Sequence, residues 1–389
     1  MKQNWTYKKL GEVCTIERGG SPRPIDEYIT DDPNGLNWIK IGDAKEGSKF
    51  ITSTKEKIKP EGLKKTRLVH KGDFILSNSM SFGKPYILDI DGCIHDGWLV
   101  IHDDNGTFDK SYLYYLLGSP NMYTEFQRLA VGGVVNNLNS EIVRNVVVPI
   151  PPLETQSQIV NELDLLQSII DKQKAQLKEL DNLAQAVFYD MFGDPVENEK
   201  GWEVKKLGDL LDSIRYGTSQ PPFFSEVGYK FIRATNIKNG RVIEEGMKFI
   251  DDSEAQKLSK CKLSGGELII VRSGVNAGDT CEITEEYVGQ YAGYDIIVKL
   301  GDLLNSTFIN SLINTRFMDV IVKPLTKRSA QPHINTEQVQ SFPIILPPLS
   351  LQQSFAAKIE AIEKQKTAIG KSIEETQKLF DYTMDKYFG

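Results

Sequence analysis

The sequence contains two similar copies of one segment, spaced about 196 residues apart. The segment NWTYKKLGEV around Trp5 returns as GWEVKKLGDL around Trp202, and IPPLETQSQIV from Ile150 returns as LPPLSLQQSFA from Leu346. Solenoid repeats are only about 20 to 50 residues long. A period of this length therefore requires each copy to be a domain-sized unit with its own hydrophobic core. The 389 residues predict a tandem duplication.

The composition indicates a protein that works in the cytoplasm. The N-terminal segment MKQNWTYKKL lacks the apolar stretch of a signal peptide, and no apolar run reaches the ~18 residues that cross a bilayer. The cysteines form no CxxC pair and the histidines do not cluster with them, so the sequence signals neither a zinc site nor a disulfide framework. We expect buried, inert thiols. The residues concerned are Cys14, Cys93, Cys261 and Cys281, and His70, His95, His102 and His333.

The net charge of −7 is unevenly distributed. Residues 151–195 hold 3 Lys and Arg against 8 Asp and Glu, whereas the blocks 1–150 and 196–346 are close to neutral. An acidic pI argues weakly against nucleic acid binding. It does not exclude basic faces on the two neutral blocks.

Each copy ends in a sustained heptad pattern. Positions alternate spacings of four and three, which is typical of a helix with one narrow apolar seam that another helix must cover. The first helix is expected over 153–192, with Pro151-Pro152 at its start and Gly193 at its stop. The seam positions are Ile159, Leu163, Leu166, Ile170, Gln173, Leu177, Leu180, Ala184, Val187 and Met191, then Phe355, Ile359, Ile362, Lys366, Ile369, Ile373, Thr376, Phe380, Thr383 and Tyr387.

The apolar seam of each helix is most naturally covered by the seam of the other helix. The lengths of the helices and of the connection then predict whether the two helices are parallel or antiparallel. Forty residues make about 60 Å of helix, whereas the 8-residue connection 194–201 spans at most about 28 Å. The connection cannot return along a parallel helix, so the pair is expected to be antiparallel, with a globular head at either end and both termini near the first head. The alternatives are that each helix packs on its own head or pairs with another molecule. The polar Gln173 and Lys366 are imperfections that can fix register.

The heads are expected to be α+β, with sheet dominating. Short β-rich runs are separated by Gly, Asn and Asp turns. Expected strands are 37–41, 73–77, 98–101 and 146–150, with counterparts 230–234, 267–271, 294–298 and 342–346, and expected helices are 111–128 and 303–320.

No catalytic motif stands out, and the remaining candidates are basic and amide-rich loops. The sequence has no phosphate-binding glycine loop, GxSxG, HExxH or kinase set. Arg, Asn and Gln can contact base edges, while Lys and Ser mostly hold phosphates; the alternative is a solvated surface. The candidate DNA-binding residues are Lys40, Lys45, Asn78, Ser79 and Lys84 in the first head, and Arg233, Lys238, Arg272, Ser273, Asn276, Lys327, Arg328 and Gln331 in the second.

These features together resemble a known family. The doubled plan is W-x2-KKLG near the start, GDFILSNS or GELIIVRSG in mid-head, and a PPL-x2-Q turn that leads into a long helix. It is similar to the specificity subunit of type I restriction-modification enzymes over essentially the whole chain. The resemblance implies two pseudo-twofold related target recognition domains, separated by a long antiparallel two-helix coiled coil. The expected boundaries are 1–150 and 194–346 for the recognition domains, and 151–193 and 347–389 for the conserved spacer helices.

The resemblance also implies function and partners. Each head would read one half of a bipartite, asymmetric double-stranded DNA target, and the coiled coil would set the gap and dock two methyltransferase subunits. Those partners would supply S-adenosylmethionine and adenine-N6 transfer, two translocating nuclease subunits would supply ATP- and Mg-dependent restriction, and this chain would hold no catalytic residue, cofactor or metal. Asymmetry is expected because Lys40 matches Arg233 and Asn78 matches Arg272 in the repeat. The competing hypotheses are a coiled-coil scaffold with protein-binding heads and a self-sufficient DNA methyltransferase.

Overall fold

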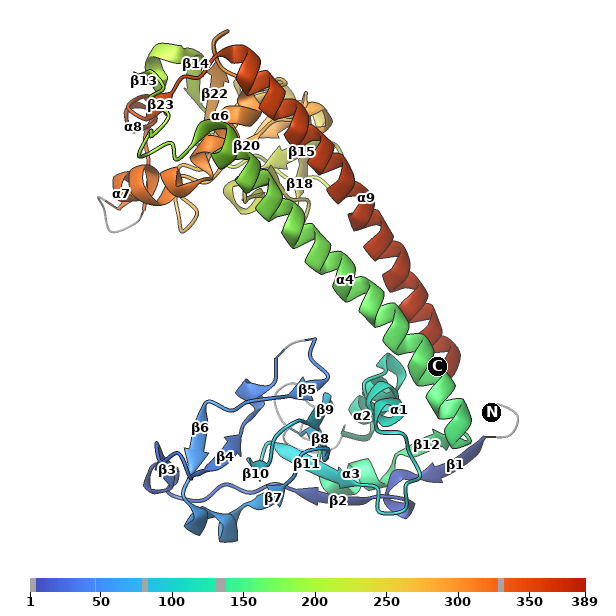
Figure 1. The fold of residues 1–389 in the computed structure, drawn as a ribbon. Helices are drawn as coiled ribbons and strands as arrows, with labels where there is room; N and C mark the ends of the chain where they lie inside the picture. The colour runs from blue at the N-terminus through green and yellow to red at the C-terminus, as the bar shows by residue number, and fades with distance from the viewer. Residues whose placement is uncertain (1–4, 46, 79–82, 131–137, 328–331) are drawn as a thin grey trace. The chain divides into compact units, whose positions relative to one another are not determined.

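The chain forms two compact units, and each is described by itself. The computed structural model describes residues 5–45, 47–78, 83–130, 138–327 and 332–389. Unit 1 comprises Met1–Gln173 and Ser372–Gly389, and unit 2 comprises Lys174–Lys371. Figure 1 shows that either unit contains mixed sheet and helix.

The described part of unit 1 contains two five-stranded sheets and a two-stranded ribbon. The strands are mostly antiparallel, with parallel pairing between β4 and β10 and between β5 and β9. In spatial order the first sheet is β3 (Ile29–Thr30), β6 (Glu56–Ile58), β4 (Leu36–Ile39), β10 (Gly92–Ile94) and β7 (Arg67–Val69). The second sheet is β2 (Thr15–Arg18), β11 (Trp98–His102), β8 (Phe74–Ser77), β9 (Pro85–Leu88) and β5 (Phe50–Ile51), and the ribbon is β1 (Thr6–Lys9) with β12 (Val147–Ile150).

The side-chain alternation of β11 divides unit 1 into layers. Successive residues of a strand point to opposite faces of its sheet, and residues 98–101 are all at most 3% exposed. Leu99 and Ile101 join the core that contains the helices, whereas Trp98 and Val100 join the core shared with the first sheet. A run that is apolar without interruption therefore forms a strand that is covered on both faces.

Unit 2 repeats this plan with smaller sheets. In the same way, Ile296 and Val298 of β22 face the core with the helices and Ile297 faces the other core. The described part has a four-stranded sheet of β14 (Leu211–Tyr216), β22 (Ile296–Leu300), β19 (Leu268–Ile270) and β20 (Thr280–Glu282), and a three-stranded sheet of β18 (Lys248–Ile250), β15 (Tyr229–Ile232) and β21 (Tyr291–Ala292). Two ribbons join β16 (Ile237–Lys238) to β17 (Arg241–Val242) and β13 (Val204–Lys206) to β23 (Pro343–Ile345). All eight strands expected from the sequence are confirmed to within two residues at either end.

The prediction of one long helix in each head is wrong, because each is broken by a hydroxyl residue that replaces a backbone hydrogen bond. The hydroxyl of Ser119 donates to the Leu116 carbonyl and accepts from the Met122 N–H, and Pro120 disfavours helical geometry at the residue before it. The hydroxyl of Thr315 likewise donates to a carbonyl in the preceding turn. The helices are α1 (Lys110–Leu117), α2 (Pro120–Ala130) and α3 (Ser140–Asn145) in unit 1, and α5 (Asp252–Lys257), α6 (Ser306–Ile313), the π-helical η9 (Met318–Val322), α7 (Lys323–Thr326) and α8 (Thr336–Gln340) in unit 2.

The two long helices are α4 (Leu153–Phe192) and α9 (Leu349–Phe388), and the helix expected over 153–192 is confirmed. A buried glutamine fixes the start of each. The Gln156 amide donates to the carbonyls of Pro151 and Thr107, and its oxygen accepts from the Asp109 N–H. The PPL-x2-Q motif therefore bonds the first turn of the helix to its own head.

Gln352 makes the same three bonds at the start of α9, to the carbonyls of Pro347 and Leu303 and from the N–H of Asn305. Both glutamine side chains are 0% exposed. The repeated motif therefore makes the same connection in both copies: a buried glutamine bonds the start of the long helix to the head.

Within each unit, α4 and α9 run antiparallel. In unit 1 the Tyr387 hydroxyl donates to Glu162, and the Gln173 amide donates 2.7 Å to the Ser372 hydroxyl. In unit 2, Lys366 pairs with Asp181. The partners fall in number along α9 as they rise along α4, so the expected antiparallel pairing is confirmed, and the polar seam residues Gln173 and Lys366 both have partners.

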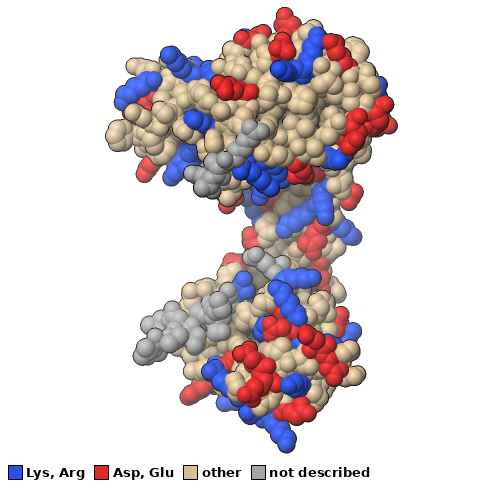
Figure 2. All heavy atoms as spheres, turned by 90° about the vertical axis from the view of Figure 1, so that its left-hand side faces the viewer, with Lys and Arg blue, Asp and Glu red and all other residues tan. Residues whose placement is uncertain are grey.

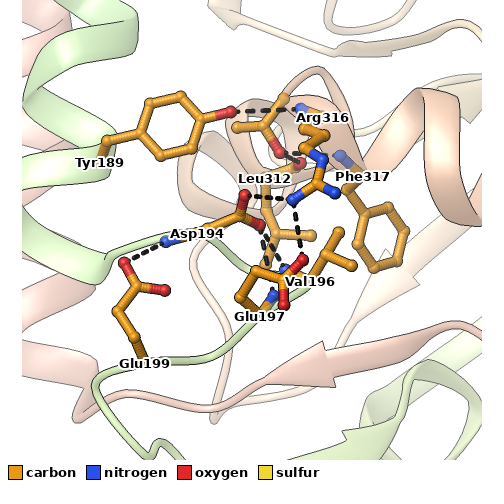
Figure 3. Close-up of polar contacts among 9 residues, drawn as sticks. Tyr189, Asp194, Val196, Glu197, Glu199, Leu312, Arg316 and Phe317 are labelled. Atoms are coloured by element: carbon orange, nitrogen blue, oxygen red, sulfur yellow. Dashed lines mark hydrogen bonds and ion pairs between the residues drawn. The ribbon is translucent and has the colours of Figure 1, made fainter.

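The connection after α4 is a compact turn held by one arginine (Figure 3). Gly193 ends the helix at φ +75, a conformation that favours glycine. Arg316 binds Asp194 at 3.0 Å and Glu197 at 2.9 Å, and the Asp194 carboxylate also accepts from the N–H of Val196. Burial alone would raise the pKa of Asp194, but these hydrogen bonds and the guanidinium outweigh it and hold that pKa below its usual value. The turn fixes the start of the second copy on its own helices.

Candidate nucleic-acid interface

A short 3₁₀ turn in each unit carries the first pair of matched candidates. Lys40 precedes η3 (Ile41–Asp43) and its N–H donates to the Asp43 carboxylate, while Arg233 precedes η6 (Ala234–Asn236) and donates to the Asn236 side chain. The main-chain frame is therefore the same in the two copies. The sequence comparison that matched Lys40 with Arg233 agrees with this geometry.

The surroundings of these two cations differ. Lys40 forms an ion pair with Glu56 at 2.5 Å. Arg233 instead donates to the Gly246 carbonyl at 2.7 Å and lies 5.9 Å from the ring centroid of Phe224. The charge of Lys40 is thus neutralised locally, whereas no carboxylate among the described residues pairs with Arg233.

An open pocket of about 1060 Å³ adjoins Lys40 in unit 1, with Ser21, Arg23, Trp38 and His95 among its walls. His95 Nδ1 accepts from the Gly97 N–H at 3.0 Å, so its proton lies on Nε2, 3.0 Å from the Asp96 carboxylate. Burial outweighs Asp96 and lowers the pKa of His95. Both ring nitrogens are therefore occupied by the protein, and His95 shapes the pocket wall.

The second matched pair, Asn78 and Arg272, follows the strands β8 and β19. Asn78 is 2% exposed and its amide donates to the Asp96 carbonyl, a placement that suits a structural residue and not a base contact. Arg272 is half-buried, and its N–H donates 3.0 Å to the buried carboxylate of Asp295. Its guanidinium lies between the rings of Tyr216 and Tyr294.

The remaining candidates lie on loops. Lys45, Lys84, Lys238 and Lys327 are exposed, while Ser273 and Asn276 are half-buried in the loop after Arg272. Ser79, Arg328 and Gln331 lie outside the described residues. Figure 2 shows Lys and Arg interspersed with Asp and Glu on the visible face of either unit, so a single continuous basic surface does not appear in this view.

The candidate seam residues lie along α4 and α9, and most are buried. Ile159, Leu163, Leu166, Ile170 and Leu180 are at most 8% exposed, as are Phe355 and Ile362, and Ile359 is 9% exposed. Leu177, Ile369, Ile373 and Phe380 are half-buried. Two of the half-buried members still pack against a core, Phe380 in unit 1 and Ile369 in unit 2.

Sequence reasoning missed the contacts that hold each head to its helices. In unit 1, Lys49 binds Asp164 of α4 at 3.1 Å, and the Tyr115 hydroxyl donates to the same carboxylate. In unit 2, Arg241 binds Asp181 at 3.2 Å and Glu363 at 2.7 Å. These ion pairs join residues at least 60 positions apart, so no local pattern could have revealed them.

All four cysteines are buried, as expected. Burial raises the pKa of Cys93 to about 11 and that of Cys14 and Cys281 to about 12. Such thiols stay protonated at neutral pH and are poor nucleophiles. Among the helices that the structure describes, none is long and apolar enough to span a membrane.

These observations define a class: a duplicated α+β protein whose two copies share one antiparallel helix pair and present unlike polar side chains on matched loops. The comparison with protein families then gives the identity. The model described as "Type I restriction modification DNA specificity domain" matches residues 2–182 and again 199–377. The chain therefore belongs to the family of type I restriction-modification DNA specificity subunits.

Individual relatives agree with this assignment. The chain is 24% identical to the "Type I restriction enzyme MjaIX specificity subunit" of Methanocaldococcus jannaschii, over 99% of this chain and 92% of the relative. It is 21% identical to the EcoKI specificity subunit of Escherichia coli strain K12, over 96% of this chain and 85% of the relative.

Two solved structures share the fold. One, described under "Structural basis underlying complex assembly and conformational transition of the type I R-M system", has a TM-score of 0.62 at 20% identity and covers 100% of this chain and 98% of its own. The S subunit from M. genitalium has a TM-score of 0.57 at 12% identity and covers 99% and 96%.

Proposed function

We propose that this chain is the sequence reader of a type I restriction-modification complex, and that each unit's head reads one half of a bipartite, asymmetric DNA target. One observation carries the proposal: matched positions on a shared main-chain framework carry different groups. Lys40 of unit 1 corresponds to Arg233 of unit 2, and the half-buried Arg272 of unit 2 corresponds to a buried structural amide, Asn78, in unit 1. A shared frame with unlike reading groups suits two different half-sites.

The recognition domains are proposed to be 1–150 and 194–346, and the spacer helices 151–193 and 347–389. In this proposal α4 and α9 set the gap between the half-sites and dock two methyltransferase subunits, and two translocating nuclease subunits complete the complex. Catalysis, S-adenosylmethionine, ATP and Mg²⁺ belong to those partners, and the chain works in the cytoplasm where its DNA lies. The mixed surface charge supports a division of labour in which partners supply many phosphate contacts.

DNA recognition is tested with the complex of this chain and its methyltransferase partner. Binding to DNA that carries the methylated motif should fall steeply as salt rises, and methylome sequencing should show one bipartite, asymmetric motif. Salt-independent binding together with the absence of such a motif would support a protein-binding scaffold instead. Methylation of DNA by the purified chain alone would support a self-sufficient methyltransferase.

The spacer role is tested by lengthening both helices by one heptad. The bond between Gln173 and Ser372 marks a place where the antiparallel helices touch, so seven residues are inserted after Gln173 and seven before Ser372. The insertion preserves the seam and adds about 10 Å of helix, which corresponds to roughly three base pairs at 3.4 Å per pair. The motif should keep both half-sites and gain a longer gap, whereas an unchanged gap would contradict the spacer role.

A further inference from the structure

Arg272 is held in a clamp of two tyrosine rings. Its guanidinium carbon lies 4.5 Å from the ring centroid of Tyr216 and 4.6 Å from that of Tyr294. Tyr216 is itself fixed, because its hydroxyl accepts from the Thr336 N–H at 3.2 Å. The main chain of Arg272 is bonded at both ends, to Asp295 through its N–H and to Ile334 through its carbonyl. The planar group is therefore preorganised.

The hydrogen-bond donors of this guanidinium have no protein acceptor among the described residues. The other described arginines of unit 2 all donate to an acceptor: Arg215 to Glu267, Arg233 to Gly246, Arg241 to Glu363, and Arg316 to Asp194. With the described residues, Arg272 makes only its main-chain bonds and the two ring contacts. The side chain is half-exposed, and no acceptor in the described part of the chain competes for its guanidinium donors, so these donors are available to a ligand.

The loop that follows presents further groups beside the clamp. Val275 is 99% exposed, and the loop is fixed by bonds from the Gly274 N–H to the Pro332 carbonyl and from the Ala277 N–H to the Gly274 carbonyl. A fixed loop with an exposed apolar tip is suited to contact with a base edge such as a thymine methyl group. The clamp and the loop together form a small, rigid recognition surface.

We propose that Arg272 is a specificity-determining residue that donates two hydrogen bonds to O6 and N7 of a guanine in the half-site read by unit 2, with Tyr216 and Tyr294 as positioning residues. The inference rests on the proposed DNA-reading function. Guanine offers two acceptors that match the fork of a guanidinium. A phosphate also accepts from arginine, but such contacts tolerate many orientations and do not need a side chain fixed between two rings.

The test uses the complex with its methyltransferase partner and the methylome as readout. Arg272→Lys keeps the charge and loses the fork, so discrimination at one guanine of one half-site should fall roughly 10- to 100-fold while the other half-site is unchanged. Arg272→Gln should shift that position toward adenine, because Gln pairs with adenine N6 and N7. Tyr216→Leu should relax the same position less, and Tyr216→Phe, which keeps the ring, least.

Lys260→Ala is the matched control, since it removes an exposed cation of the same unit that is not among the candidate DNA-binding residues, and it should leave the motif unchanged. An unchanged motif in both Arg272 variants, with a bipartite motif in the wild type, overturns this inference and leaves the proposed function intact. A loss of affinity that is uniform across sequences, with a salt slope smaller by about 1, would identify a phosphate contact and also overturn it. No bipartite motif in the wild type overturns the proposed function itself.

Discussion

The two units share one backbone arrangement, but at equivalent positions, called corners below, they carry different side chains. The match is fixed by backbone bonds: Gly19 donates to the Trp98 carbonyl in unit 1, and Gly217 donates to the Asp295 carbonyl in unit 2. Around this point, three matched positions are Arg18, Asn78 and Gly97 in unit 1 and Tyr216, Arg272 and Tyr294 in unit 2. The central position is thus a buried amide in one unit and an aromatic-clamped cation in the other.

This difference shows which parts of the duplicated fold are constrained. The two buried glutamines and the 3₁₀ caps are preserved because buried hydrogen-bonding groups need partners. The side chains at the matched positions bond differently in the two units: Asn78 donates to the Asp96 carbonyl, whereas Arg272 stacks on two rings. These positions have therefore diverged without loss of the fold. Stability should therefore respond alike to matched changes in the frame, and recognition should respond differently to matched changes at the corners.

The largest expected effect tests the shared frame. Gln156→Leu and Gln352→Leu each leave one N–H and two carbonyls without their partner. Each buried group left unsatisfied costs about 1–3 kcal/mol, so each variant should lose several kcal/mol, on the order of 3 or more. Urea unfolding measures the loss. The controls are Gln167→Leu and Gln377→Leu, whose amides bond only an aspartate on their own helix among the described residues. A large loss in only one of the two variants would contradict an equivalent connection in the two copies.

The next effect concerns the buried carboxyl of Asp295, which accepts the Arg272 N–H in unit 2. Burial raises the pKa of Asp295 to about 6, against the hydrogen bond and charge of Arg272. Because the folded pKa exceeds the unfolded one, the stability contribution of this carboxyl is fully present below pH ~4 and is lost as pH rises through about 6. Asp295→Asn, which keeps an acceptor for the Arg272 N–H, should stabilise unit 2 by about 1–3 kcal/mol at pH 7.5.

The gain should vanish near pH 4, and thermal unfolding at the two pH values measures it. The exposed Asp302→Asn serves as control and should show no such pattern. A gain that is the same at both pH values would contradict a buried carboxylate, as would a loss at pH 7.5 that persists at low pH.

The matched cations should differ in their effect on DNA affinity. Lys40 must leave its ion pair with Glu56 before it can bind DNA, whereas Arg233 has no such competitor among the described residues. Arg233→Ala should therefore weaken binding by the complex about tenfold, and Lys40→Ala by about threefold or less. Glu56→Gln should raise the affinity and its salt dependence. Equal losses from the two alanine variants would show that the ion pair does not matter.

The smallest effect concerns the helix seam. Lys366 is buried and pairs with Asp181, which is itself more than half exposed and also bound by Arg241. Lys366→Met keeps the length and apolar stem of the side chain, and Asp181 keeps a cation, so the unfolding free energy should change by no more than about 1 kcal/mol. A loss of several kcal/mol, measured by urea unfolding, would mean that the buried ion pair is essential to the seam.

Much of the frame could be predicted from sequence because its signals are local and periodic. The heptads gave both long helices, apolar runs gave the strands, and the doubled motifs gave the duplication. The break at Ser119 and Thr315 was missed because a hydroxyl that bonds back to the chain leaves no gap in the apolar pattern. The match to the family model confirmed the resemblance that these motifs indicated.

The candidate site was harder to predict. Arg272 was proposed from its residue type. Its two tyrosines come from other parts of the chain, Tyr216 from the end of β14 and Tyr294 from the bend before β22, and only the folded sheet brings them to it. Asn78 was proposed on the same grounds and lies in the interior, where its amide bonds the main chain. Composition identifies residues that can read DNA, whereas exposure and neighbours decide which of them are placed to do so.

The central claim is that unlike groups on a common frame read unlike half-sites, and a chain with two identical heads tests it most directly. In this chimaera the connection 194–201 is kept, and the rest of the second head, residues 202–346, is replaced by a second copy of residues 1–150. The methylome is then sequenced in cells that also hold the methyltransferase partner. The account predicts that the asymmetric bipartite motif becomes a palindrome, with the first half-site repeated in inverted orientation. A motif that stays asymmetric in the chimaera would contradict it.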